Sequence, residues 1–255
     1  MTVQSHVAAG GSTRARLVAV LAGAALAASV AVAAPAAASD AQPAAVSVTV
    51  QAFDKRKSAT SCKYVYWTFT ASGLSSSKTY YADVSLTRSG ESINSYTSAS
   101  TVKNGTNKVK SFACSSLHKA GTWKAKVAIK TGGSVVATSK TVSSKLRVKP
   151  ALEIGSVYGT IGGTATLSGY ADPGLDTKGK KVKVYFKKKG SKTYKLIGTT
   201  TVSTSSGYFT LKTTKLGLGY TYVKMEKTDY TVSSTSKSVQ LVKSSSAPAA
   251  PLSLG

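Results

Sequence analysis

The chain has 255 residues and a formal net charge of +25, from 34 lysine and arginine residues against nine aspartate and glutamate residues. Two histidines and two cysteines provide few groups for acid–base, nucleophilic or metal chemistry. We therefore expect a basic protein that is not an enzyme and that holds neither a cofactor nor a metal.

The N-terminal segment has the pattern of a secretory signal peptide. Arg14 and Arg16 supply a positive start, residues 17–34 are small and apolar, and the following PAAAS predicts cleavage after Ala38. A retained membrane anchor is the alternative, because about 18 apolar residues can span a bilayer. The run is mostly alanine and no basic patch follows it, which favours cleavage. We expect a secreted protein, extracellular or associated with a cell wall, with no membrane span after processing.

The rest of the sequence alternates as β-strands do. From Lys181 onward, Val182, Val184 and Phe186 fall on one face, while lysines and Tyr185 fall on the other. Gly-Ser and Ser-Gly pairs mark turns into two further strands within residues 180–212. The pattern predicts an antiparallel sheet that is apolar inside and covered with lysine outside.

The strand pattern breaks most clearly at Pro150, which removes a backbone donor and holds its predecessor extended. Before this break we expect seven strands, at 46–54, 61–71, 79–87, 93–101, 108–113, 122–130 and 134–148, which is typical of a β-sandwich. After the break the plan repeats, so we predict an all-β chain of two antiparallel sandwiches. The predicted boundaries are a signal peptide at 1–38, a lead-in at 39–45, a first sandwich at 46–148, a linker at 149–151, a lysine-rich second sandwich at 152–243 and a disordered tail at 244–255.

Two stretches resemble known domains. Leu74 to Tyr80 (LSSSKTY), followed by alternating residues, resembles the leucine-to-tyrosine corner of fibronectin type III and related immunoglobulin-like domains. VKV from Val182, YKL from Tyr194 and SGYF from Ser206 resemble the immunoglobulin-like repeats of secreted actinobacterial proteins. The resemblance covers most of the chain after the signal peptide and implies two immunoglobulin-like sandwiches in tandem. It implies the fold, not a ligand.

Cys62 and Cys114 lie in the first domain and do not bracket a tryptophan as antibody cysteines do. In an exported chain two thiols usually pair, so we expect a disulfide between the start of the second strand and the end of the fifth. Two free thiols are the alternative. The antibody Cys–Trp–Cys core is not expected.

Candidate catalytic groups are few. His118 is the only histidine after the signal peptide, and the neighbouring Ser115 and Ser116 form no recognisable nucleophile–base motif. Asp172 and Asp176 flank a Pro-Gly turn, and we interpret them as turn-capping residues. No pair of acids has the spacing of a glycosidase or a calcium loop.

Positive charge is the first functional signal. Removal of Arg14 and Arg16 with the signal peptide lowers the net charge from +25 to +23, and the lysines are spread over both domains. They can serve solubility and block pairing of sheet edges, or they can attract an anionic wall polymer, nucleic acid or acidic polysaccharide. Lysine lacks the planar fork of arginine, so we expect no sequence-specific binding of nucleic acid. The candidate polyanion-binding residues are Lys178, Lys180, Lys181, Lys183, Lys187, Lys188, Lys189 and Lys192.

Outward-facing aromatic residues are the second signal. If Val65 and Trp67 point into the first sandwich, Tyr64 and Tyr66 point outward, as Tyr185 does in the second. We take these three tyrosines as candidates for stacking on sugar rings, although tyrosine also simply favours strands. Trp123 begins the sixth strand and is expected to pack in the core or at a corner of the sandwich.

These signals favour a secreted, non-enzymatic module that binds an anionic cell-wall or matrix polymer or glycan through lysine-rich sheet faces. A protein-interaction module, such as an adhesin or inhibitor that acts through loops, is the first alternative. An accessory to a secreted enzyme is the second. An enzyme would require a pocket that gathers His118 with two acids.

Overall fold

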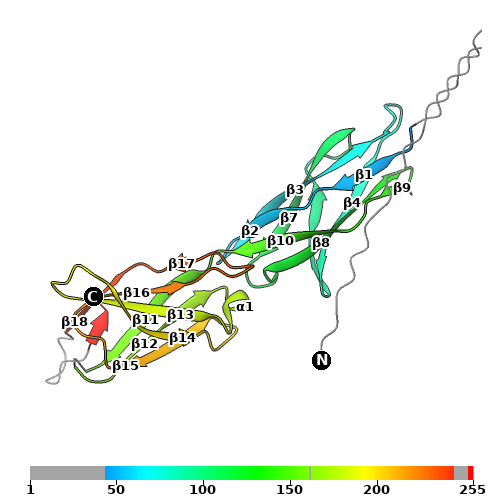
Figure 1. The fold of residues 1–255 in the computed structure, drawn as a ribbon. Coiled ribbons are helices and arrows are strands. Elements are labelled where there is room, and N and C mark those ends of the chain that lie inside the picture. The colour runs from blue at the N-terminus through cyan, green and yellow to red at the C-terminus, as the bar shows by residue number, and fades with distance from the viewer. Residues whose placement is uncertain (1–43, 161, 244–251, 255) are drawn as a thin grey trace, which may run out of the picture. The chain divides into compact units, whose positions relative to one another are not determined.

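The computed structural model describes residues 44–160, 162–243 and 252–254, within a unit that spans residues 43–255. The predicted signal peptide lies outside the described residues. Apart from one short helix, α1 (Gly174–Thr177), every regular element among the described residues is a strand, as the sequence predicted (Figure 1). In the same part of the chain, no helix is long and apolar enough to cross a membrane.

Two sheets pack against each other in the first half of the chain. One has the order β1 (Ser47–Val50), β3 (Cys62–Ser72), β7 (Gly105–Cys114) and β6 (Ser95–Thr97). The other has the order β2 (Asp54–Lys57), β10 (Val142–Val148), β8 (Gly121–Thr131), β4 (Tyr81–Arg88) and β5 (Glu91–Ile93), with β9 (Ser134–Thr138) also paired to β8.

The second half of the chain repeats this arrangement. Its smaller sheet has the order β11 (Ala151–Gly159), β12 (Ala165–Asp172) and β15 (Tyr208–Thr213). Its larger sheet has the order β14 (Lys195–Thr201), β13 (Lys181–Lys188), β16 (Gly219–Met225), β18 (Val239–Lys243) and β19 (Leu252–Leu254), with β17 (Ser234–Thr235) beside β16.

This strand order is that of an immunoglobulin-like sandwich, in which strands A, B, E and D form one sheet and C, F and G the other. In the first sandwich β1, β3, β7 and β6 occupy the places of A, B, E and D, and β4, β8 and β10 those of C, F and G. In the second, β11, β12 and β15 take the places of A, B and E, and β13, β16 and β18 those of C, F and G. Among the described strands, β2 and β10 form the only parallel pair.

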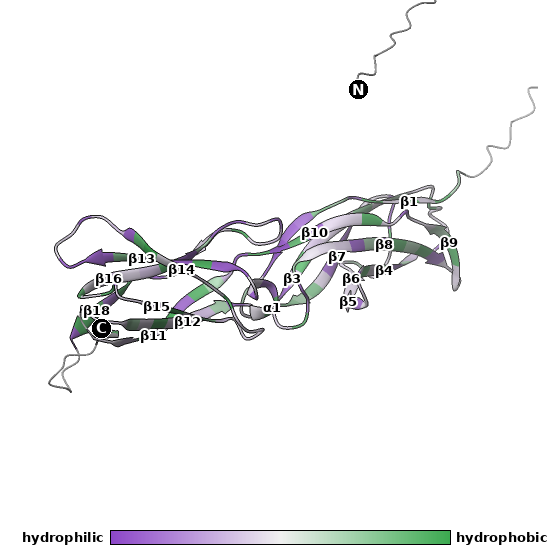
Figure 2. Ribbon diagram, turned by 60° about the horizontal axis from the view of Figure 1, so that its bottom comes forward, coloured by the Kyte–Doolittle hydropathy of each residue, from purple (hydrophilic) through white to green (hydrophobic). Residues whose placement is uncertain are grey.

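Each sandwich has its own apolar core. Phe69 and Trp123 are fully buried in the first, so of the two positions expected for Trp123, core or corner, the structure shows the core. Leu167, Val184 and Phe209 are fully buried in the second. Hydrophilic and hydrophobic residues alternate along the strands (Figure 2), so one side of each sheet faces the core and the other faces solvent.

The predicted tyrosine corner makes the expected kind of contact. Tyr80 is 5% exposed, and its hydroxyl oxygen accepts a hydrogen bond of 3.3 Å from the backbone N–H of Ser75. In antibody-type domains this corner precedes strand F. Here it precedes β4, in the place of strand C.

The structure corrects three predicted strands, each of which is divided in two. The runs at 46–54 and 93–101 cross from one sheet to the other, and a strand must end where the chain changes layer. The run at 134–148 stays beside β8 but is interrupted at Ser139. The Ser139 hydroxyl accepts a hydrogen bond of 3.0 Å from the Val127 N–H in place of a backbone partner.

The C-terminal segment also differs from its prediction. Residues 244–255 were expected to be disordered, but Leu252–Leu254 form β19, which pairs antiparallel with β18. Leu254 packs against the second core. The rest of the predicted tail, residues 244–251 and 255, lies outside the described residues.

The predicted disulfide is present and lies within one sheet. Cys62 begins β3 and Cys114 ends β7, and the two are directly opposite each other in the ladder, with Cα atoms 3.8 Å apart. An antibody-type disulfide joins strands B and F across the two layers. This one joins neighbouring strands and leaves the core to the aromatic residues.

The inward face of β13 provides a test of the fold. Val184 is fully buried, so Val184→Asp places an unpaired carboxylate in the second core, at a cost of several kcal/mol against a typical stability of about 5–15 kcal/mol. Lys181→Asp, on the outer face of the same strand, is the matched control and should change the free energy of unfolding little. Urea unfolding followed by circular dichroism checks both; equal stability of the two variants would mean that the faces are reversed.

Candidate functional site

An aromatic cluster covers part of the outer side of the first sheet. Tyr64 on β3 is its centre: its ring centroid lies 6.3 Å from Tyr66, 6.1 Å from Tyr96 and 5.2 Å from Phe112. The Lys110 Nζ lies 6.0 Å from the Tyr64 centroid and 5.6 Å from the Tyr96 centroid. We call these five residues the aromatic face.

Strand register produces this face. Tyr64 lies opposite Phe112, and Tyr66 opposite Lys110, in the ladder of β3 and β7. Tyr96 on β6 pairs with Lys110 from the other side. Since alternate residues of a strand share a side of the sheet, all five side chains emerge on the same surface.

The aromatic face is exposed. Its three tyrosines and Phe112 retain between 40% and 50% of their accessible surface. Interaction with the Tyr64 side chain raises the pKa of Tyr96, which favours the neutral phenol. A contiguous group of large exposed aromatic side chains is typical of a binding surface, whereas scattered ones are not.

A groove adjoins the aromatic face. It has a volume of about 510 Å³ and is lined by Tyr66, Lys108 and the segment 51–55 that carries the chain from β1 to β2. The rings of Phe53 and Trp67, which also line the groove, stack with centroids 5.8 Å apart. The groove therefore extends the aromatic face with further aromatic rings and lysine in its lining.

The second sandwich carries a related surface on β13 and β16, though its tyrosines pack more tightly. The Tyr185 and Tyr222 rings stack with centroids 4.9 Å apart, and Tyr194 meets Tyr222 edge-on at 4.8 Å. Lys187 Nζ lies 5.0 Å from the rings of both Tyr194 and Tyr220. Tyr185, unlike Tyr64 and Tyr66, therefore already has one face covered by another ring.

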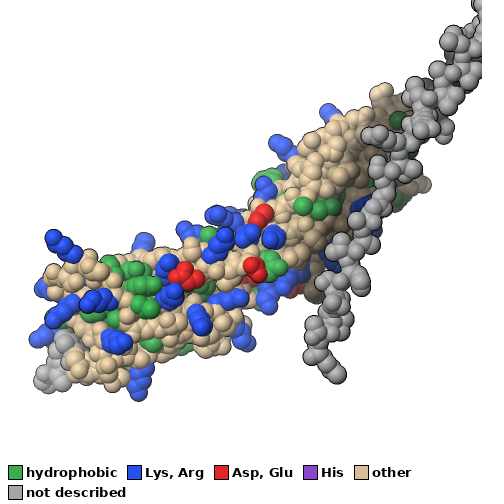
Figure 3. Space-filling view, in the orientation of Figure 1, with side chains coloured by type: hydrophobic (Ala, Val, Ile, Leu, Met, Phe, Trp, Pro, Cys, Tyr) green, Lys and Arg blue, Asp and Glu red, His purple; other side chains and the backbone are tan. Residues whose placement is uncertain are grey.

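The structure divides the eight candidate lysines into three groups. Lys181, Lys183 and Lys187 project from the outer side of β13, where Lys183 is paired with Glu226 at 3.1 Å. Figure 3 shows lysine and arginine side chains across the visible face, with few acidic ones between them. The second group lies at the turn after β13 and is exposed: Lys188, Lys189 and Lys192. The third group, Lys178 and Lys180, lines a pocket beside the first sandwich.

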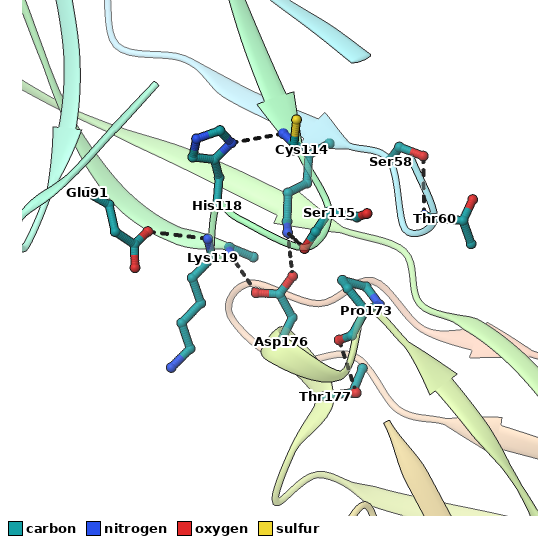
Figure 4. A network of polar contacts seen from close by, with 12 residues as sticks. Ser58, Thr60, Glu91, Cys114, Ser115, His118, Lys119, Pro173, Asp176 and Thr177 are labelled. Carbon is teal, nitrogen blue, oxygen red and sulfur yellow. Dashed lines mark hydrogen bonds and ion pairs between the residues drawn. The ribbon is translucent and has the colours of Figure 1, made fainter. Parts of the chain in front are cut away.

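The structure corrects the expectation that Asp176 caps a turn. It lies on α1 with its side chain 2% exposed, and its Oδ2 is 2.7 Å from Nζ of Lys57, which is fully buried on β2 of the first sandwich. Asp176 Oδ1 accepts a hydrogen bond of 2.6 Å from the Ala120 N–H, and Lys57 Nζ also donates to the Ser115 carbonyl at 3.2 Å. Figure 4 shows Asp176 turned toward the loop that carries Ser115, His118 and Lys119. Asp172, by contrast, is half-buried, and burial raises its pKa.

Other contacts accompany this ion pair between the two sandwiches. Thr122 and Tyr230 share a hydroxyl hydrogen bond of 3.0 Å, and Val148 exchanges backbone hydrogen bonds with Tyr230 and Val232. Burial lowers the pKa of Lys57, and Asp176 opposes that shift. The charged lysine is therefore held in place by its partner.

His118 has a structural role in the same loop. Its Nδ1 accepts a hydrogen bond of 2.9 Å from the Cys114 N–H, so the ring must be neutral. Burial, together with the positive charge of Lys57, lowers the pKa of His118 and favours that state. The pocket that contains Asp176 is lined by one acid and not by His118, and no three possible metal-ligating side chains gather among the described residues.

No protein-family model matches the chain, and no curated protein matches it. Among solved structures, a marsupial T cell receptor is similar over 82% of this chain and 71% of its own, with 14% sequence identity and a TM-score of 0.37. The strand order itself defines the class: a protein of two immunoglobulin-like β-sandwiches.

The Lys57–Asp176 ion pair yields the second test. Asp176→Asn leaves a buried lysine without its counter-charge, and loss of one partner of a buried pair costs about 3–5 kcal/mol. Glu226→Gln, which breaks the exposed pairs with Lys183 and Lys224, should change the free energy of unfolding little. Urea unfolding at pH 7 compares the two; equal losses would show that Asp176 contributes no more than a surface charge.

Proposed function

We propose that the protein is a secreted, non-enzymatic module that binds an acidic glycan polymer of a cell wall or extracellular matrix. Aromatic rings of the aromatic face stack on the sugar rings, and lysines of both sandwiches pair with the anionic groups along the polymer. The observation that carries this proposal is the aromatic face itself: three exposed aromatic side chains around Tyr64, with Lys110 beside the rings of Tyr64 and Tyr96.

The chemistry of the face suits a glycan. A sugar ring presents C–H groups on one side and hydroxyls at its edge, so it can lie on a tyrosine ring and still bond to phenol groups. Lys110 beside the rings, and Lys108 at the edge of the groove, supply charge for an acidic substituent. The adjoining groove gives space for further units of a chain.

The lysines add attraction at longer range. With a net charge of +23 after removal of the signal peptide, the protein gathers anionic polymer near its surface, and many weak lysine contacts act together along one chain. The lysines of β13 and its turn extend this attraction to the second sandwich. Such lysine contacts attract any anionic polymer and do not discriminate between nucleic-acid sequences.

Export supports the same proposal. The signal-peptide pattern of the first 38 residues, the Cys62–Cys114 disulfide and the resemblance to repeats of secreted actinobacterial proteins all favour the oxidising cell exterior. Anionic wall and matrix polymers occur there.

A protein partner is the alternative that a specific observation favours. Phe112 keeps 40% of its surface exposed, and an exposed phenylalanine among tyrosines also suits a protein interface. This alternative predicts a tight complex that depends on the aromatic face and is insensitive to salt.

The aromatic face is tested by Tyr64→Ala and Phe112→Ala together. Because stacking aromatic residues are common binding hot spots, we expect at least a tenfold loss of affinity for heparin or an anionic wall polymer, measured by calorimetry. Tyr158→Ala, which removes a tyrosine that is 60% exposed on β11, is the matched control and should bind normally.

Inorganic polyphosphate separates stacking from charge, since it has no sugar rings. The aromatic variant should bind polyphosphate as wild type does. An aromatic variant that keeps full affinity for the glycan would refute the proposed stacking.

The lysines are tested by changing Lys181, Lys188, Lys189 and Lys192 to Gln. Each contact with a polyanion releases counterions, so on duplex DNA of arbitrary sequence the slope of log affinity against log salt should fall by roughly 0.9 for each phosphate that the variant no longer neutralises. The control changes Lys124, Lys126, Lys140 and Lys145 to Gln, which lowers the net charge equally on the first sandwich. Equal slopes for the two variants would show that only net charge matters.

A further inference from the structure

A cationic pocket lies where the two sandwiches meet. It has a volume of about 360 Å³ and is lined from the first sandwich by Arg88 and Lys119, and from the second by Lys178 and Lys180. Arg88 is at the end of β4, and the two later lysines follow α1 directly. The pocket therefore brings together four cations from both halves of the chain.

The acids nearby do not neutralise these cations. Asp176 is the one acid that lines the pocket, and its carboxylate is occupied by Lys57 and the Ala120 N–H. Within the described part of the chain, the Glu91 side chain accepts one hydrogen bond, a long one of 3.4 Å from the Lys119 N–H. Among the described residues, none of the four cations forms a salt bridge, in contrast to Lys183 and Lys224, which share Glu226.

The Arg88 guanidinium has a buried hydrogen-bond donor that is not paired among the described residues. Its Nη1 is buried and has no hydrogen-bond acceptor among the described residues. The guanidinium lies against Gly121, where a Cβ atom would stand only 3.0 Å from its Cζ and Nε. Buried donors without acceptors are rare, because each forfeits the hydrogen bonds it made in water, and such a donor commonly marks a place where water or an ion binds.

We propose that this pocket binds a compact oxyanion, a phosphate or sulfate group. Arginine offers a planar fork that fits two oxygens of such a group, and lysines on the other side add charge without demanding one geometry. The hydroxyl side chains of Ser205, Thr228 and Tyr230 in the lining can donate further hydrogen bonds. The site is separate from the aromatic face and does not rest on the function proposed above.

Because residues of both sandwiches line the pocket, a bound oxyanion contacts both. It should therefore oppose their separation, and a ligand that binds only the native state raises the unfolding temperature as its concentration rises above its dissociation constant. The same chemistry can come from free phosphate or from phosphate groups on a polymer.

The test is a titration of the mature protein with inorganic phosphate, at constant ionic strength adjusted with chloride. Calorimetry and thermal unfolding should show saturable binding and a rise in unfolding temperature that chloride does not produce. Arg88→Gln should weaken phosphate binding at least tenfold, as should Lys178→Gln with Lys180→Gln. Lys124→Gln with Lys126→Gln, two exposed lysines outside the pocket, should leave it unchanged.

Since Arg88→Gln also alters a buried group, the double lysine variant and backbone amide shifts provide a second measurement. Phosphate should shift the amide resonances of residues 174–180 and 119–121 in wild type and not in the lysine variant. Competition between phosphate and a phosphorylated wall polymer would identify the polymer as the source, and its absence would identify the free ion. Equal responses to phosphate and chloride, or equal phosphate binding by the pocket and control variants, would overturn the proposal.

Discussion

A two-layer sandwich buries only one side of each strand, and the surface properties of this chain follow from that constraint. On β13, Val182 and Val184 are fully buried while Lys181 on the opposite side is exposed. On β3, Val65 and Trp67 fill the core while Tyr64 and Tyr66 face outward. Each sheet must thus present a row of side chains to its surroundings, and in this chain those rows carry lysine and tyrosine.

The charged residues between the sandwiches differ from those on the outer faces in their exposure to water. On the outer faces charge is solvated and adjustable, whereas Lys57 and Asp176 are withdrawn from water and depend on each other. A buried charge pair fixes position more than it adds stability, because only one arrangement places the two charges together. Around this fixed point the pocket keeps four further cations without acidic partners among the described residues.

Local alternation was enough to predict the inner and outer faces, and the expectation of export was enough to predict the disulfide. Alternation was not enough to assemble the aromatic face, because Phe112 and Tyr96 join Tyr64 only through the register of three strands. Alternation within residues 108–113 could have placed Phe112 on the outer face. It could not have shown which side chains of the neighbouring strands lie beside Phe112. Asp176 gave no signal at all, since Lys57 is more than a hundred residues earlier in the chain and meets it only in the folded protein.

The position of the disulfide has a mechanical consequence. Cys62 and Cys114 are 52 residues apart in sequence, and they tie the two strands that bear most of the aromatic face directly to each other. If the chain were pulled from its two ends, the force would pass through this cross-link, and the intervening segment could not extend. At about 3.3–3.6 Å per residue, roughly 170–190 Å of chain would stay folded back under load. Tyr64 and Phe112 would remain side by side even while strands outside the cross-link were stretched.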